Sequence, residues 1–187
     1  MTELNALKQD GLETIGMTTN GVALTAKRAQ RLKTAGLDTV NISLDTLEPM
    51  KAEFITRRPS TFHKRAISSL DHALEAGLNV KVNCVLQRDL NFDEIVPLVE
   101  LARHRPISIR FIEFMPFNGN DWAKGAKFVS LREILQVVTK EYGEVDYVQG
   151  RRDDVAREWR VDGFNGTFGI IGSMSQPFCS GCSRYFI

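Results

Sequence analysis

Short β-prone runs alternate with amphipathic helical stretches over the first 116 residues, and this alternation constrains the fold more than any other feature. The expected strands are residues 14–19, 39–45, 79–87 and 107–115, and the expected helices are residues 25–36, 60–77 and 91–105. Single helices between successive strands produce parallel βαβ crossovers. We therefore predict an α/β fold, either a barrel or a doubly wound sheet.

Local signals mark the ends of the expected helices. Thr25 is a good N-cap residue, and Gly36 and Gly77 follow the last turns of the first two helices, where glycine is favoured. Asn91 and Glu94 have the spacing of a capping box, which predicts that the third helix begins at Asn91.

The chain changes character after Pro116. A loop over residues 116–128 leads to one more helix, expected from Ser130 to Tyr142, and then to β-prone runs at residues 144–149, 158–163 and 166–173. Short strands separated by charged or glycine-containing turns predict an antiparallel β/α extension. The predicted domains are residues 1–116, a parallel βα unit, and residues 117–187, the extension.

Composition excludes several classes of partner. The net charge is only +1, from 24 Lys and Arg against 23 Asp and Glu, so no overall field attracts nucleic acid or an anionic membrane. No apolar run approaches the roughly 20 residues of a membrane helix, and the N-terminal residues do not resemble a targeting signal. The three cysteines favour a reducing compartment. The three histidines lie on expected helices, and we expect them to face solvent.

The expected strands are not continuously apolar, although strands of a parallel sheet are usually buried on both faces. Apolar and polar residues alternate in all four. The polar residues that share a face within their strand are Thr18 and Asn20; Asn41, Ser43 and Asp45; Lys81, Asn83 and Gln87; and Ser108 and Arg110.

If helices cover the apolar faces, the polar residues converge inside a barrel. Two of these residues, Lys81 and Arg110, are cations, and the pattern places no carboxylate directly opposite them. We therefore expect an anionic ligand such as a polyphosphate. The alternative is a set of internal hydrogen bonds.

A C-x-x-C pair, Cys179 and Cys182, follows Phe178 near the end of the chain. Two thiolates do not complete a zinc site or an iron–sulfur cluster, so such a site needs further ligands from elsewhere.

Several ordered segments carry a resemblance to a known family. The segments are TTNG, LDTVNISLDTL, KVNCVLQRDLN, IRFIEFMPFNGNDW and FCSGCSR. Together they resemble the GTP 3′,8-cyclase family, the radical S-adenosylmethionine enzymes of molybdenum cofactor biosynthesis. The resemblance implies a partial radical SAM βα barrel, and GTP as substrate. It also implies a [4Fe–4S] cluster at each end of the barrel, S-adenosylmethionine as the radical source, and a homodimer for the complete enzyme.

The resemblance also implies roles for individual residues. The GTP contacts are Thr18, Lys81, Arg110, which would meet the triphosphate, and Arg184. The S-adenosylmethionine contacts are Ser43 and the backbone of Met115, and the ligands of the second cluster are Cys179 and Cys182. A methionine at a strand end is also a common packing residue, which is the alternative for Met115.

The chain departs from the family pattern at both ends. The C-x-x-x-C-x-x-C motif of the first cluster is not in this sequence, and the third cysteine of the second cluster is missing. The tail from Ser183 to Ile187 differs from the family's C-N-R-L-R continuation. Cys84, on an apolar strand face, is expected to be a buried structural thiol. We therefore expect a fragment of the family enzyme that is inactive alone, with no catalytic residue assigned within it.

Two other functions stay open at this stage. The chain is either a non-catalytic product that binds GTP or a partner subunit, or an aldolase-like enzyme in which Lys81 forms a Schiff base and the C-x-x-C is half of a zinc site. The segment FIEFMPFNGNDW resembles the eukaryotic branch of the family, which favours the mitochondrial matrix; a bacterial origin would indicate the cytoplasm.

Overall fold

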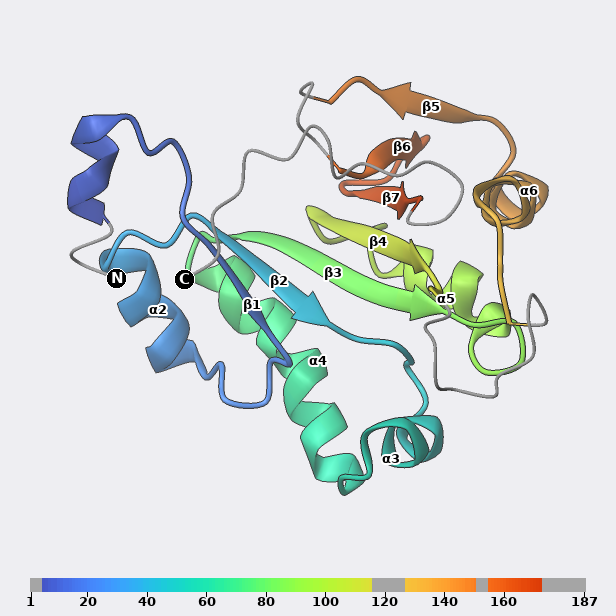
Figure 1. The fold of residues 1–187 in the computed structure, drawn as a ribbon, viewed down its shortest axis with the longest axis horizontal. Helices are drawn as coiled ribbons and strands as arrows, with labels where there is room; N and C mark the ends of the chain where they lie inside the picture. Colours follow the sequence, from blue (N-terminus) through green and yellow to red (C-terminus); the bar gives the residue numbers. More distant parts are fainter. Residues whose placement is uncertain (1–4, 116–126, 151–154, 173–187) are drawn as a thin grey trace. The chain divides into compact units, whose positions relative to one another are not determined.

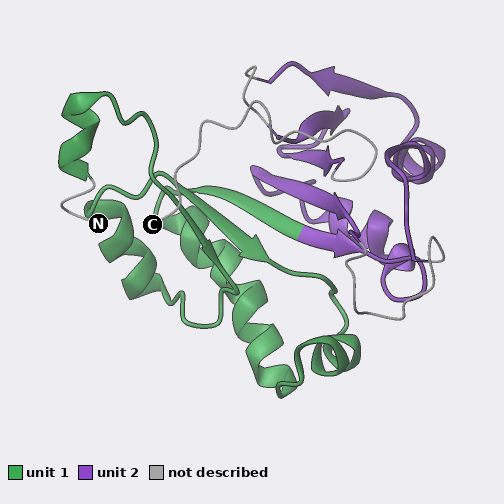
Figure 2. Cartoon of the chain, viewed as in Figure 1, with its two compact units in different colours: residues 1–83 green, residues 84–187 purple. Residues whose placement is uncertain are grey.

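The computed structural model describes residues 5–115, 127–150 and 155–172. The chain divides into two compact units, residues 1–83 and residues 84–187, which Figure 2 colours separately. Each unit is described by itself. Within the described ranges, no helix combines the length and the apolar character that crossing a bilayer requires.

The first unit is a parallel βα array (Figure 1). Its elements are η1 (Leu7–Asp10), β1 (Gly16–Thr19), α2 (Ala26–Thr34), β2 (Thr39–Ser43), α3 (Pro49–Thr56), α4 (Ser60–Glu75) and β3 (Asn79–Leu86), the last of which runs three residues past the unit boundary. β1 pairs with β2 in parallel, and β2 pairs with β3 in parallel. These elements confirm the α/β class and the expected strands and helices. Helix α3 was not predicted.

Helix α2 begins and ends, and helix α4 ends, where the local signals place these boundaries. The hydroxyl of Thr25 accepts a hydrogen bond from the backbone N–H of Arg28 at 3.4 Å, so Thr25 is the N-cap of α2. Gly36 and Gly77 have φ angles of 98° and 74°, the left-handed conformation that glycine adopts without strain. Helix α4 contacts both α2 and β2, and the strand residues Val40, Ile42, Val80 and Val82 are buried. One face of the array is therefore apolar and covered by helices.

The second unit combines parallel and antiparallel pairing. Its elements are η2 (Phe92–Glu94), α5 (Ile95–Glu100), β4 (Ile107–Glu113), α6 (Leu131–Tyr142), β5 (Val145–Val148), β6 (Arg157–Val161) and β7 (Thr167–Ile171). β5–β6 and β6–β7 are antiparallel, which confirms the antiparallel extension, and β7 also pairs with β4 in parallel. Strand β4 thereby acquires a neighbour from the C-terminal part of the chain.

The predicted capping box at Asn91 is wrong. The Asn91 side chain accepts a hydrogen bond from the backbone N–H of Gln87 at 2.8 Å and donates one to the carbonyl of Val85 at 3.0 Å. It therefore stabilises the turn after β3 and leaves no cap for a helix beginning there. A capping box does form at the next helix, where the Ser130 hydroxyl accepts from the backbone of Glu133 and the Glu133 carboxylate accepts from the backbone of Ser130.

Gly166 lets the chain approach β4 closely before β7 begins. Its N–H donates to the carbonyl of Ala102 at 2.9 Å, and the preceding residue, Asn165, donates to the carbonyl of Arg103 at 3.0 Å. A Cβ at Gly166 would collide with the backbone carbonyls of Ile107 and Arg105. Because those atoms belong to the chain entering β4, they cannot move aside without disturbing the strand pairing.

We predict that Gly166→Ala lowers the free energy of unfolding by about 3 kcal/mol, near the upper range for overpacking. Denaturant unfolding followed by circular dichroism measures the change. Gly16→Ala is the matched control, since a Cβ there would meet only the carbonyl of Thr39 at 3.9 Å. Equal unfolding midpoints for the two variants would contradict the close approach.

Candidate functional site

Strand register brings polar residues of the first unit into one cross-strand row. In β1 and β2, Thr18 is opposite Asn41, and in β2 and β3, Asn41 is opposite Lys81. Neighbouring strands lie about 4.8 Å apart, so Thr18 and Lys81 are two strand spacings apart on the same face. Thr18 is exposed and the other two are partly buried. The structure therefore brings together two residues expected at a GTP site, Thr18 and Lys81, and adds Asn41 between them.

A second row lies two residues further along the strands. Here Ser43 is opposite Asn83. The side-chain oxygen of Asn83 is buried and has no hydrogen-bond partner among the described residues. An acceptor left without a donor costs stability, so it marks a position where a ligand or water is expected to donate. Asn83 was noted only as part of the polar face; its orphaned oxygen is what singles it out.

The remaining site residues expected from the sequence are not brought together by the described residues. Met115 lies just after β4 in the second unit and is 55% exposed. Cys179, Cys182 and Arg184 lie outside the described residues. Cys84 is fully buried, and its sulfur accepts a hydrogen bond from the amide of Asn91 at 3.6 Å, which confirms the structural thiol.

The described residues do not form a cluster or metal site. Within residues 5–115, 127–150 and 155–172, no three His, Cys, Asp or Glu side chains are placed to hold a metal ion. The expectation for the histidines is wrong for His63, which is buried with its Nε2 3.0 Å from the carbonyl of Thr46. This ring orders the segment that follows β2 and is not available as a ligand on the surface.

Arg110, in β4, has a carboxylate partner that the sequence pattern did not reveal. Its Nη2 donates to Oε1 of Glu158, in β6, at 2.9 Å, and the Arg110 side chain is only 6% exposed. Ser108 also donates to Oε1 of Glu158 at 2.9 Å, and Thr167 donates to Oε2 at 3.0 Å. The expectation that neither strand cation faces a carboxylate is therefore wrong for Arg110.

Gly169 makes this pair possible. In the second unit, Arg110 of β4 is opposite Gly169 of β7, and Gly169 is opposite Glu158 of β6. A Cβ at Gly169 would lie 3.0 Å from Cγ of Glu158. Since position 169 has no side chain, the Glu158 side chain extends over β7 and reaches the guanidinium two strands away.

The network keeps Glu158 ionised. Burial opposes ionisation of the carboxyl, but the charge of Arg110 and the hydrogen bonds from Ser108, Arg110 and Thr167 outweigh it, and the pKa of Glu158 is lowered from its ordinary value of 4.5. Arg110 and Glu158 are thus a charged pair at neutral pH.

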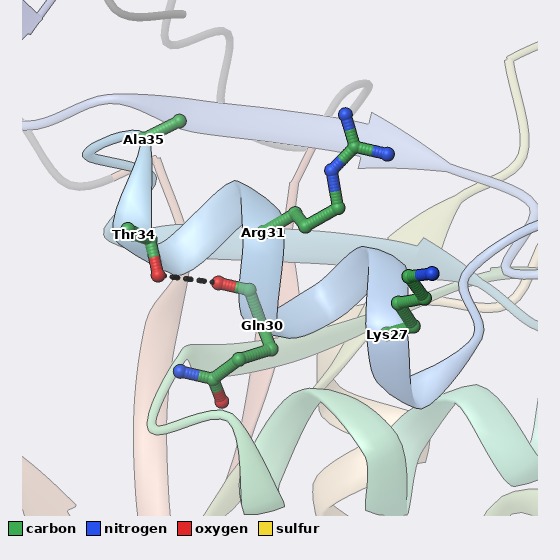
Figure 3. Close-up of a pocket in the computed structure, with 5 residues that line it drawn as sticks. All are labelled: Lys27, Gln30, Arg31, Thr34 and Ala35. Carbon is green, nitrogen blue, oxygen red and sulfur yellow. Dashed lines mark hydrogen bonds between the residues drawn. The ribbon is translucent and has the colours of Figure 1, made fainter.

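A separate basic surface lies on helix α2. Figure 3 shows a shallow hollow lined by Lys27, Gln30, Arg31, Thr34 and Ala35. The lining residues in this part of the structure all come from one helix or its C-terminal end, and the Thr34 hydroxyl donates to the backbone carbonyl of Gln30 at 3.0 Å. A single helix face with two cations one turn apart is typical of a solvated surface, so we do not assign it as the site.

Two family models together match almost the whole chain. The Radical SAM superfamily profile matches residues 1–102, and the profile described as Molybdenum Cofactor Synthesis C matches residues 107–187. The chain belongs to the Radical SAM superfamily. Members of this superfamily use S-adenosylmethionine and a [4Fe–4S] cluster. The match confirms the radical S-adenosylmethionine part of the family resemblance.

Several named relatives align with most of this Radical SAM chain. It is 48% identical over 183 residues to a protein of Arabidopsis thaliana named GTP 3′,8-cyclase, mitochondrial, with 97% of this chain and 45% of the relative covered. It is 45% identical to human Molybdenum cofactor biosynthesis protein 1, covering 94% of this chain and 27% of the relative. It is 40% identical to GTP 3′,8-cyclase of Staphylococcus aureus, covering 94% of this chain and 51% of the relative. The chain thus spans about half or less of these relatives.

We predict that the Glu158 pair makes stability depend on pH in a defined window. Because the pKa of Glu158 is lowered on folding from 4.5, its contribution is complete above that value and is lost as the pH falls through the lower pKa of the folded state. The difference in unfolding free energy between wild type and Glu158→Gln should be constant from pH 8 to about pH 6 and shrink below about pH 4.5. Urea unfolding at each pH measures it. A difference that does not change with acid would contradict an ionised Glu158.

Proposed function

We propose that this chain is part of a GTP 3′,8-cyclase of molybdenum cofactor biosynthesis and that its own residues bind GTP. The observation that carries the proposal is the cross-strand row of Thr18, Asn41 and Lys81 in a Radical SAM chain. The names of the relatives supply the reaction and the substrate.

The chemistry of the row suits a nucleotide. The ammonium of Lys81 forms charge-assisted hydrogen bonds with phosphate oxygens, while the hydroxyl of Thr18 and the amide of Asn41 can bind sugar or base groups. Lys81 also interacts with other groups of the protein. Arg110 and Arg184 are further proposed GTP contacts, Arg110 at the triphosphate.

S-adenosylmethionine is the second proposed ligand. A hydroxyl at Ser43 and the unsatisfied oxygen of Asn83 offer a donor and an acceptor side by side, which suits an amino-acid or ribose group. The Met115 backbone is the further proposed contact. We propose that β1, β2 and β3 belong to a parallel barrel of the radical SAM type, with the ligands on its polar face.

Iron–sulfur chemistry is proposed only for residues outside the described ranges. Cys179 and Cys182 are the proposed ligands of the second [4Fe–4S] cluster. In the proposed enzyme the radical comes from S-adenosylmethionine at the first cluster, to which these two cysteines do not belong. The described residues contribute binding and orientation. Lack of turnover by this chain alone stays a prediction, tested by anaerobic reconstitution and assay for 5′-deoxyadenosine.

We predict that Lys81→Ala weakens GTP binding about 10- to 100-fold, the range for losing a hydrogen bond to a charged group. Isothermal titration calorimetry with this chain measures the dissociation constant. Lys27→Ala is the matched control, because it removes the same charge from an exposed position on α2 (Figure 3). Borohydride trapping with a carbonyl compound tests the Schiff-base alternative for Lys81.

The two variants separate the possible outcomes. Weakening by Lys81→Ala alone supports the row as the GTP site. Equal weakening by Lys27→Ala would indicate that phosphate is attracted to the α2 surface or to charge in general. Absence of GTP binding by the wild-type chain would contradict the proposed function.

A further inference from the structure

Glu158 is placed to hold the Arg110 guanidinium in one orientation. We propose that Glu158 is a positioning residue, which acts through Arg110 and presents the remaining N–H groups of that arginine to an anionic ligand. The ligand class is a phosphate group, and this identification rests on the proposed function, in which Arg110 meets the GTP triphosphate.

The contacts of Glu158 leave its carboxylate little freedom. Oε1 accepts from both Arg110 and Ser108 at 2.9 Å, and Oε2 accepts from Thr167 at 3.0 Å. The donors come from two strands, β4 and β7, while Glu158 itself is in β6. Three hydrogen bonds from two neighbouring strands fix the position of the carboxylate, and the fixed carboxylate in turn fixes the guanidinium.

Arg110 keeps donors for a ligand. A guanidinium carries five N–H groups. In the described part of the chain, Nη2 donates to Glu158 and Nε makes a longer contact of 3.4 Å with the Ser108 hydroxyl, whereas Nη1 has no partner. Glu158 therefore occupies one side of the guanidinium and leaves the two N–H groups of Nη1 for an oxygen of a ligand.

Orientation, rather than attraction over distance, is what this arrangement supplies. Glu158 offsets the positive charge of Arg110, so the pair draws a distant anion only weakly. An arginine that is already ordered, however, loses little side-chain entropy when the ligand binds. The alternative is that Glu158 competes with the ligand for Arg110 and must be displaced. This alternative is disfavoured, because displacing Glu158 would break three hydrogen bonds and leave a partly buried charge without partners.

Gly169 provides a variant that disturbs the pair without changing any charge. A Cβ at this position would lie 3.0 Å from Cγ of Glu158 and 3.2 Å from the carbonyl of Arg157. Because the Glu158 side chain is the movable group, Gly169→Ala should push it away from Arg110. Thr167→Val is a milder variant of similar shape, which removes only the hydrogen bond to Oε2.

The test measures GTP affinity by calorimetry and Arg110 mobility by NMR of its side-chain N–H groups. We expect Gly169→Ala and Thr167→Val to speed rotation of the guanidinium and weaken GTP binding about three- to tenfold, the entropic cost of ordering one long side chain. Glu158→Gln keeps the size of the side chain but removes its charge and one acceptor oxygen, so it should also loosen the guanidinium and weaken GTP binding. Gly16→Ala is the control for a glycine change in a strand.

The outcomes distinguish this inference from the proposed function. If wild type binds GTP and Arg110→Ala weakens binding, but Gly169→Ala and Thr167→Val do not, the positioning role is wrong. If Glu158→Gln and Gly169→Ala both bind GTP more tightly, Glu158 competes with the ligand and the inference is also overturned. If wild type binds no GTP, the proposed function fails. The NMR measurement is then made with inorganic pyrophosphate. Unchanged Arg110 mobility in the variants would overturn the inference.

Discussion

Hydrogen-bonded register between neighbouring strands is the constraint on which both candidate sites depend. In the first unit the register aligns Thr18, Asn41 and Lys81, and a shift of one residue would carry these side chains to the face covered by helices. In the second unit it aligns Arg110, Gly169 and Glu158 across three strands. The apolar residues that alternate with the polar ones fix the register, because they must stay buried. Core packing and ligand geometry are therefore set by the same pairing.

The Arg110–Glu158 ion pair of the second unit is largely buried, and burial is unfavourable for charged groups. Arg110 is nearly buried, and a buried ion pair often contributes little net stability because desolvation offsets the attraction. The hydrogen bonds from Ser108 and Thr167 satisfy the carboxylate further, but an apolar strand position would avoid the desolvation cost altogether. The pair is therefore better explained by the ligand contact proposed for Arg110 than by the stability that it adds.

Much of the fold could be predicted from the sequence, because strand and helix periods and caps such as Thr25 are local signals. The polar strand faces could be predicted for the same reason. Glu158 could not, since it is 48 residues from Arg110 and their contact depends on how β7 enters between β4 and β6. Asn91 has a capping-box pattern, yet its side chain bonds to the turn after β3. His63 is buried with its Nε2 against the carbonyl of Thr46, in the segment after β2, and no helical pattern shows this contact.

The two units use polar groups in opposite ways, and the difference bears on how each meets a ligand. In the second unit the Glu158 carboxylate accepts three hydrogen bonds, one of them from Arg110, so Arg110 is ordered before a ligand binds. In the first unit the oxygen of Asn83 has no hydrogen-bond partner among the described residues, which costs stability unless a water or a ligand donates to it. A ligand that donates to Asn83 would therefore gain the desolvation free energy already lost on folding. Such a ligand stabilises the folded chain by binding it, so stability and binding are linked most directly at the Ser43–Asn83 row.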